Sequence, residues 1–351
     1  MEQKQKNNEL LWPAWQAMFG YEEMYMQALA WLNECDEVLL VSHMHPDGDA
    51  ASATTSMSWI LDQLEIPHTA INIDPLPKKF QKQYNFSNVL QASITAAPLE
   101  KFKYVIFVDC ADRERTGDLT AWIDDNANIL NVDHHATNKK FGTVNVVDPI
   151  AASATEVIFG LFCYLELSLE QEFAYSIYTG MLTDTEGFRY SNTTPRVLRT
   201  AATCLETGIP GHVIAEESLG QTTKAHVELL KRALQRLQFS DDGRIAFVSV
   251  TVQDMDETNG TFADLEGIVN IPRNAEDVEV GVLFKEMKAG TVKVSLRSGD
   301  SMNVSDIAGL FGGGGHKKAA GCTVNGSIED AINIIIPEIT KVLTKVPVNG
   351  G

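Results

Sequence analysis

The chain has 351 residues, of which 44% are hydrophobic, and this is enough for two domains with apolar cores of their own. Its 28 Lys and Arg residues are outnumbered by 47 Asp and Glu residues, so the formal net charge is −19. A chain this acidic has little positive surface for a nucleic-acid duplex, which excludes stable duplex binding and leaves short single strands as candidate ligands.

The sequence predicts a cytoplasmic protein that does not enter membranes. We find no apolar run of about 18 residues, the minimum for a membrane span, and no signal peptide with an apolar centre and a small-residue cleavage site. The five cysteines are odd in number and lack metal-type spacing, which is typical of reduced, buried thiols.

The N-terminal segment contains an aromatic patch formed by Trp12, Trp15, Met18 and Phe19. Such an amphipathic helix could touch a membrane, but we favour packing on its own domain or on the partner subunit of a homodimer.

Short apolar runs then alternate with helical segments, as in a parallel sheet wrapped by helices. We predict strands at 37–41, 104–108, 128–132 and 143–147. We predict helices at 50–65, 152–167, 170–182 and 195–207. The fold class is therefore α/β, with an N-terminal, doubly wound and mainly parallel sheet.

A helix is predicted at 224–239, and the half of the chain that follows it has a different order of strands and helices. There we predict strands at 244–251, 278–286 and 291–297, a helix at 303–311, a glycine run and a closing helix at 327–344. The change of pattern divides the chain into a first domain at 1–210, a helical linker at 211–240 and a smaller α/β domain at 241–351, with a cleft between the two domains.

Ionisable side chains directly follow the first three predicted strands. They are His43, Asp47 and Asp49 after the first strand, Asp109 after the second, and Asp133, His134 and His135 after the third, while Asp184 follows an apolar helix. The carboxyl ends of parallel strands meet at one edge of a sheet, where ligands bind. Any one of these residues could be an ordinary helix cap or loop residue.

As a set, these residues predict bound cations. Two carboxylates 4 Å apart repel by about 4 kcal/mol at an effective dielectric near 20, and four of them multiply this cost. Two divalent ions would offset the four carboxylates, with two imidazoles as neutral donors. Carboxylates without thiolates favour two Mn²⁺ ions, with Mg²⁺ or Co²⁺ as alternatives. A pair of such ions is typical of enzymes that attack phosphorus.

Four stretches in order, "SHMHPDGDA", "VDCAD", "VDHHATN" and "TDTEGFRYSN", resemble the motifs of the DHH phosphoesterase superfamily, which is named after the triplet at 133–135. The stretch "VSLRSGDSMNVSDIAGLFGGGGHKKAAG" resembles the DHH-associated substrate domain. The two-domain layout is similar to the nanoRNase branch, oligoribonucleases that also remove the 3′-phosphate from phosphoadenosine phosphate.

The resemblance implies a role for each residue of the first domain. One metal would be held by His43, Asp47 and Asp109, and the other by Asp49, Asp109, His134 and Asp184. Asp133 would orient a ligand histidine, and His135 would face the substrate phosphate as a donor or proton source. We expect His45 to be no ligand and Glu186 to point into solvent.

The second domain carries the expected substrate contacts. A glycine run lets the backbone approach a phosphate closely, and a guanidinium can grip a phosphate at two points, although such a run taken alone is more often a flexible loop. The resemblance implies phosphate and nucleotide binding by Arg297, Ser298, Gly313, Gly314, Gly315 and His316. We expect Arg113 and Arg115 to form solvated or structural ion pairs.

The resemblance implies an Mn-dependent phosphodiesterase or exoribonuclease that cleaves short single-stranded RNA or DNA and dinucleotides, with 3′(2′),5′-bisphosphate nucleotidase activity on phosphorylated nucleotides. The enzymatic alternatives are a phosphodiesterase for cyclic or linear dinucleotides and an inorganic pyrophosphatase or polyphosphatase. The non-enzymatic alternative is a nucleotide-binding module with a decayed metal site. Retention of all six expected ligands argues against decay.

Overall fold

The computed structural model describes residues 12–220, 222–287, 290–299 and 302–344. The chain packs into two compact units that divide between Gln221 and Thr222. The segment 211–240, expected as a linker, contributes to both units. Helix α8 (Gly211–Ala215) belongs to the first, whereas α9 (Lys224–Gln235) buries Leu229 in the core of the second.

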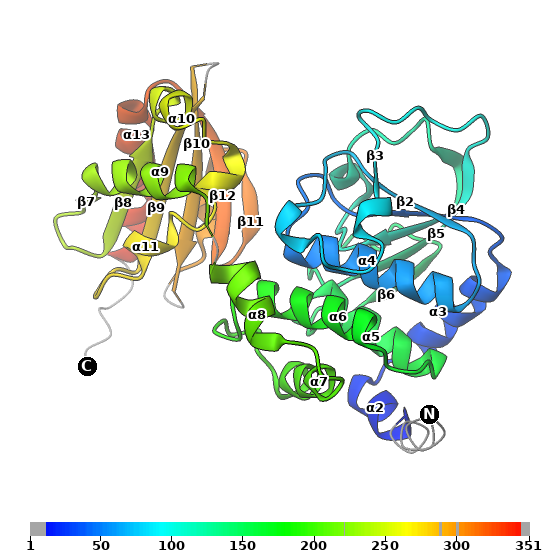
Figure 1. Cartoon of the computed structure of the whole chain (residues 1–351). Helices are drawn as coiled ribbons and strands as arrows, with labels where there is room; N and C mark the ends of the chain where they lie inside the picture. The colour runs from blue at the N-terminus through cyan, green and yellow to red at the C-terminus, as the bar shows by residue number, and fades with distance from the viewer. Residues whose placement is uncertain (1–11, 221, 288–289, 300–301, 345–351) are drawn as a thin grey trace. The chain divides into compact units, whose positions relative to one another are not determined.

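The first unit is built on a six-stranded parallel sheet with the order β3-β2-β1-β4-β5-β6 (Figure 1). Its strands are β1 (Val38–Val41), β2 (His68–Asn72), β3 (Leu90–Gln91), β4 (Phe102–Val108), β5 (Ile123–Asp133) and β6 (Val144–Val147). This confirms the predicted α/β fold and the four predicted strands. The strand order reverses between β1 and β4, which is where ligands bind in open α/β sheets.

Helix α4 (Gly48–Gln63) is buried along most of its length between the sheet and two further helices, α5 (Ala154–Leu165) and α6 (Gln171–Asp184). Glycines permit this close packing. A Cβ on Gly48 would lie 2.5 Å from Thr183 Oγ1, and one on Gly180 would lie 2.4 Å from Thr155 Oγ1. Helix α7 (Pro195–Glu206) packs beside α6, and the side chain of its N-cap residue, Thr194, accepts from the N–H of Val197.

The N-terminal helices α2 (Trp12–Phe19) and α3 (Glu22–Glu34) pack against α5. Phe19 is 2% exposed, and the Trp15 ring lies 5.2 Å from the Phe159 ring. The aromatic patch is therefore part of the first unit's own core, although the side chain of Trp12 lies outside the described residues. None of the described helices is long and apolar enough to cross a membrane.

The second unit has a mixed sheet with the order β11-β12-β10-β9-β8-β7, in which β8 and β9 pair in parallel and the other neighbours are antiparallel. Its strands are β7 (Gln238–Phe239), β8 (Ile245–Val250), β9 (Val280–Met287), β10 (Thr291–Ser298), β11 (Gly314–His316) and β12 (Ala319–Asn325).

Each face of this second sheet carries its own apolar core. Helices α12 (Val304–Leu310) and α13 (Ile328–Leu343) cover one face. Helix α9, the short helix η5 (Phe262–Leu265) and α11 (Asn270–Arg273) pack on the other face over β8 and β9. Helix α10 (Val252–Thr258) packs against α9.

The glycine run is not entirely a loop, because Gly314 and Gly315 belong to the edge strand β11. A Cβ on Gly313 would lie 2.1 Å from the carbonyl oxygen of Gly321, and one on Gly315 would lie 2.5 Å from that of Ala319. These two glycines are therefore required by the approach of β11 to β12.

Candidate metal centre

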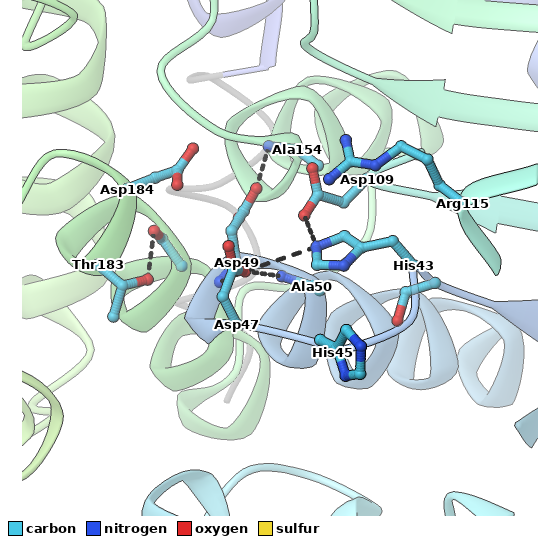
Figure 2. Close-up of polar contacts among 12 residues, drawn as sticks. His43, His45, Asp47, Asp49, Ala50, Asp109, Arg115, Ala154, Thr183 and Asp184 are labelled. Atoms are coloured by element: carbon cyan, nitrogen blue, oxygen red, sulfur yellow. Dashed lines mark hydrogen bonds and ion pairs between the residues drawn. The ribbon is translucent and has the colours of Figure 1, made fainter. Parts of the chain in front are cut away.

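The loop after β1 presents the first group of candidate ligands. His43 is 6% exposed, and its Nδ1 donates to the carbonyl oxygen of Met44 at 2.9 Å, which turns Nε2 toward Asp109 Oδ2 at 3.2 Å (Figure 2). Asp47 caps α4 by accepting from the backbone N–H groups of Asp49 and Ala50, and its Oδ1 lies 3.9 Å from His43 Nε2. The cap fixes the start of α4, so Asp47 and Asp49 are held at the same sheet edge.

Asp109 follows β4 and is the most central of the candidate ligands. Its backbone adopts φ 54°, a left-handed conformation that Asp tolerates better than most residues, and its carboxylate is buried. Oδ2 faces His43, whereas Oδ1 lies 3.6 Å from His134 Nε2 and has no hydrogen-bond partner among the described residues. A buried carboxylate oxygen without a donor is costly unless a cation binds it.

His134 brings together the second group. Its Nδ1 donates to the carbonyl oxygen of Ala151 at 3.3 Å, so that Nε2 points at Asp184 Oδ2, 3.4 Å away. Asp49 completes this group from the first turn of α4. Its carboxylate also accepts from the N–H groups of Ala154 and Thr155 at the start of α5, which fixes it in place.

Among the described residues, the candidate ligands form two groups whose donor atoms lie within 4.8 Å of one another: His43, Asp47 and Asp109 in one, and Asp49, His134 and Asp184 in the other. Asp109 belongs to the first group, lies 3.6 Å from His134 of the second, and forms a further group with Asp133, His134 and His135. The first group has the residues of one ligand set that the family resemblance implies, and the second has those of the other set without Asp109.

The charges of this site are poorly balanced by the protein alone. Burial raises the pKa of Asp49 to about 7, and the charge of Asp109 adds to this effect. Burial opposes protonation of His43, but its hydrogen bond to Asp109 and the nearby carboxylates outweigh this and raise its pKa to about 9. Burial opposes ionisation of Asp109, but the imidazoles of His134 and His43 beside its carboxylate outweigh this and hold the pKa of Asp109 well below its usual range. Divalent cations would take over the role of these shared protons, so the residues fit a metal site.

The remaining residues of the DHH triplet form a chain of polar contacts beside the metal site. Asp133 is fully buried at the end of β5 and accepts from His135 Nδ1 at 2.7 Å and from Asn138 at 2.6 Å. The expectation that Asp133 orients a ligand histidine therefore differs from the structure, in which Asp133 orients His135 and a backbone carbonyl orients His134.

Arg115 is the residue of this site that sequence reasoning missed. Its Nη1 donates to His135 Nε2 at 3.2 Å, where an ordinary ion pair was expected. Its backbone is fixed on both sides, because Asp112 accepts from its N–H and Met44 donates to its carbonyl oxygen. No sequence motif predicts this contact, because the two residues are 20 positions apart and meet only through the fold of the loops that carry them.

Comparison with known proteins agrees with this geometry. Residues 37–182 match the DHH family, N-terminal domain, and residues 244–345 match the DHHA1 domain. A Thermus thermophilus protein named bifunctional oligoribonuclease and PAP phosphatase NrnA is 30% identical over 312 residues, which are 88% of this chain and 90% of that protein. This chain belongs to the DHH superfamily, in its NrnA-like branch.

Further relatives of this DHH protein cover similar lengths. A Bacillus subtilis protein with the same NrnA name is 24% identical over 294 residues, covering 82% of this chain and 90% of that protein. The crystal structure of an exopolyphosphatase-related protein from Bacteroides fragilis has the same fold, with a TM-score of 0.82 at 23% identity over 92% of this chain and 96% of that one.

The DHHA1 unit separates two residues that were predicted to act together. Ser298 is 6% exposed on the core side of β10, and its hydroxyl donates to the carbonyl oxygen of Met302 at 2.8 Å. Arg297 is on the opposite face, because successive strand residues alternate. Arg297 pairs with Ala319, which pairs in turn with His316, but the His316 side chain lies outside the described residues.

Two residues of the DHH motifs lie apart from the two ligand groups. The side chain of His45 is 84% exposed and lies 2.9 Å from Asp74, away from the candidate ligands. Glu186 accepts from the Tyr190 hydroxyl at 3.5 Å. Neither residue is in the candidate ligand groups formed by the described residues.

Proposed function

We propose that this chain is a hydrolase with two Mn²⁺ ions that cleaves short single-stranded oligonucleotides and dinucleotides and removes phosphate from 3′-phosphoadenosine 5′-phosphate (pAp). The observation that carries the proposal is the position of buried Asp109, which lies 3.2 Å from His43 within one group of three candidate ligands and 3.6 Å from His134 of the other group. The names of NrnA relatives that match over more than four-fifths of this chain support the substrate class.

The proposed ligands are His43, Asp47, Asp49, Asp109, His134 and Asp184. Two ions held there would lower the pKa of a bridging water and neutralise the phosphoryl oxygens. The histidines are pre-oriented, since each donates Nδ1–H to a backbone carbonyl and keeps Nε2 for the ion. The carboxylate-rich set without thiolates supports Mn²⁺, with Mg²⁺ or Co²⁺ as substitutes.

Arg115 and His135 would act on the substrate phosphate. In the structure His135 Nε2 accepts from Arg115, so its lone pair is engaged and its Nδ1 proton is held by Asp133. Arg115 is thus the group that carries a positive charge toward the phosphate, and His135 positions it. We also propose the cytoplasm as the compartment, which the five free cysteines support.

The test is a substrate panel with metal-stripped protein and added Mn²⁺. The panel holds a dinucleotide, a five-nucleotide RNA, pAp, bis-p-nitrophenyl phosphate and pyrophosphate. We expect hydrolysis of the first four and none when a chelator is in excess. Hydrolysis of pyrophosphate alone would favour the phosphate-only alternative, and nucleotide binding without turnover would favour the binding module.

Two variants connect the activity to the site. Asp109→Asn keeps the size of the side chain but removes its charge, so we expect turnover to be lost and fewer than two Mn²⁺ ions to be retained in equilibrium dialysis. His45→Ala changes an exposed histidine of the same motif and should retain both. Two bound ions and a near-normal rate in Asp109→Asn would contradict the assignment.

A further inference from the structure

The DHHA1 sheet has a cationic face, which we define by Lys285, Lys293, Arg297 and Arg273. In β10 the residues Val292, Val294 and Leu296 are buried in the core under α12 and α13. The alternate positions, which include Lys293 and Arg297, are therefore on the opposite face. This face therefore gathers four of the 28 Lys and Arg residues in a chain whose net charge is −19.

Lys285 and Lys293 form a cross-strand pair on this face. They are directly opposite each other on β9 and β10, a position in which like charges are destabilising. Lys285 is half-buried and donates to the Ser295 hydroxyl at 2.9 Å. Burial lowers its pKa to about 8, and the charges of Lys293 and Arg297 act in the same direction. A bound anion would relieve both costs.

Arg273 extends the face from α11. A Cβ on Gly281 would lie 2.5 Å from Arg273 Cβ, and one on Gly299 would lie 2.9 Å from Arg273 Nη2. Gly281 pairs with Arg297 across the strands, so Arg273 lies on the same side of the sheet as Arg297. Gly281 thus leaves space for the Cβ of Arg273, and Gly299 leaves space for its guanidinium.

An exposed aromatic ring borders the cationic face. Phe262 of η5 is 55% exposed, although its neighbour Leu265 is 4% exposed in the core over β8 and β9. Lys293 Nζ lies 5.6 Å from the centre of the Phe262 ring. A ring presented to solvent next to cations is the arrangement with which proteins stack bases and neutralise the backbone of single-stranded nucleic acids.

We propose that Phe262 and the Lys285–Lys293 pair form a binding site for a single-stranded oligonucleotide, with a base stacked on Phe262 and backbone phosphates on the two lysines. The site rests on the proposed function for its substrate class and extends it to residues outside the recognised motifs. It commits to a nucleic acid rather than an acidic peptide, because the ring offers a flat surface that bases use independently of their sequence.

Binding is measured on the full chain in EDTA, so that turnover does not interfere. The probes are a fluorescein-labelled five-nucleotide RNA, followed by anisotropy, and tripolyphosphate as a competitor without bases. We expect Phe262→Leu to weaken RNA binding by about fivefold or more and to leave the affinity for tripolyphosphate unchanged. Lys285→Met and Lys293→Met should weaken both probes. Each should also reduce the slope of log affinity against log salt by about 0.7.

Matched controls are present in the same unit. Phe239 is 50% exposed on β7, and Lys341 is exposed on α13 and paired with Glu338, so Phe239→Leu and Lys341→Met should bind as the unchanged protein does. The proposal is overturned if the unchanged protein does not bind RNA in EDTA. It is also overturned if the controls lose as much affinity as the site variants, or if an acidic peptide competes as well as RNA. If the unchanged protein binds RNA but shows no Mn²⁺-dependent hydrolysis, this would contradict the proposed function and leave the binding site intact.

Discussion

Arg115 shows at the residue scale how a charge is held at a reaction site. Its guanidinium donates to His135, which is held by buried Asp133, so the positive charge has a defined position next to the candidate ligands. The backbone contacts to Asp112 and Met44 fix the loop as well. The electrostatic contribution is therefore organised before the substrate arrives.

We expect Arg115→Ala to lower kcat/KM on a dinucleotide by at least about tenfold, since hydrogen bonds to charged groups contribute about 1.5–3 kcal/mol. Arg115→Lys should recover part of this loss, because it restores the charge without the fork geometry. Steady-state kinetics with saturating Mn²⁺ measure the effect. Arg113 is exposed in the same short helix, η3 (Arg113–Thr116), and kcat/KM of Arg113→Ala should be near normal. Equal losses in Arg113→Ala and Arg115→Ala would show that only general charge matters.

At the scale of elements, the contact between α4 and α6 couples packing to the metal site. A Cβ on Gly180 would lie 2.7 Å from Asp49 Oδ1 as well as 2.4 Å from Thr155 Oγ1. Asp49 could not keep its contacts to the start of α5 if that space were filled. A glycine in a helix interior lowers the stability of the helix. At position 180 it permits the close approach of α6 to Asp49 and Thr155.

We therefore expect Gly180→Ala to lower stability by about 1–3 kcal/mol and to weaken Mn²⁺ binding, because overpacking displaces Asp49. Gly309 in α12 is the matched control, since nothing lies within 4 Å of its Cβ position. Gly309→Ala should raise stability by up to about 1 kcal/mol through helix propensity. Thermal denaturation and metal titration test both variants. A Gly180→Ala protein with unchanged metal affinity would argue against this coupling.

The opposed lysines of β9 and β10, Lys285 and Lys293, predict that the stability of the second unit depends on pH. The pKa of Lys285 is lowered from its ordinary value of 10.5 to about 8 in the folded state, so protonated Lys285 destabilises the fold. This cost is fully present below about pH 8 and fades as the pH rises toward 10.5, because the folded state loses the proton first. The charges of Lys293 and Arg297 act on it and add repulsion rather than relief.

Lys285→Met should accordingly be more stable than the unchanged protein at pH 7, by on the order of 1 kcal/mol, and the difference should shrink by pH 10. Chemical denaturation at the two pH values measures it. Lys341→Met removes an exposed, paired lysine and should show no such gain. A Lys285→Met protein that is less stable at pH 7 would mean that the hydrogen bond from Lys285 to Ser295 outweighs the cost of burial and repulsion.

The sequence predicted the strands that are continuous runs of apolar residues. The apolar runs of β1, β4, β5 and β6 were recognised, but β2 is half polar and β3 has two residues, so neither gave a signal. The clustering of the candidate ligands could be predicted because parallel strands end at one edge. Arg115 could not, because its contact depends on a loop conformation. The burial of Ser298 could have been found, since it shares the parity of Val294 and Leu296 in β10.

At the scale of the whole molecule, the charge of −19 should restrict substrate length. A long strand that extends beyond the cationic face would meet an acidic surface and gain little affinity per added phosphate. We expect kcat/KM to be higher on a dinucleotide than on an RNA of about 24 nucleotides, and the difference to narrow at high salt as charges are screened. Rates on the two substrates at two salt concentrations test this. Faster cleavage of the longer RNA would contradict it.

The two N-terminal helices have a practical consequence for anyone who wishes to trim this protein. The family match begins at residue 37, yet the core of the first unit already includes Phe19, Tyr25 and Trp31. Gly160 in α5 leaves space for one of these side chains, because a Cβ there would lie 2.2 Å from the Tyr25 hydroxyl. A shortened protein that starts at Glu37 would uncover the apolar side of α5 and would be prone to aggregate. The boundary of the recognisable homology is thus not the boundary of the folding unit, and expression fragments have to begin upstream of α2.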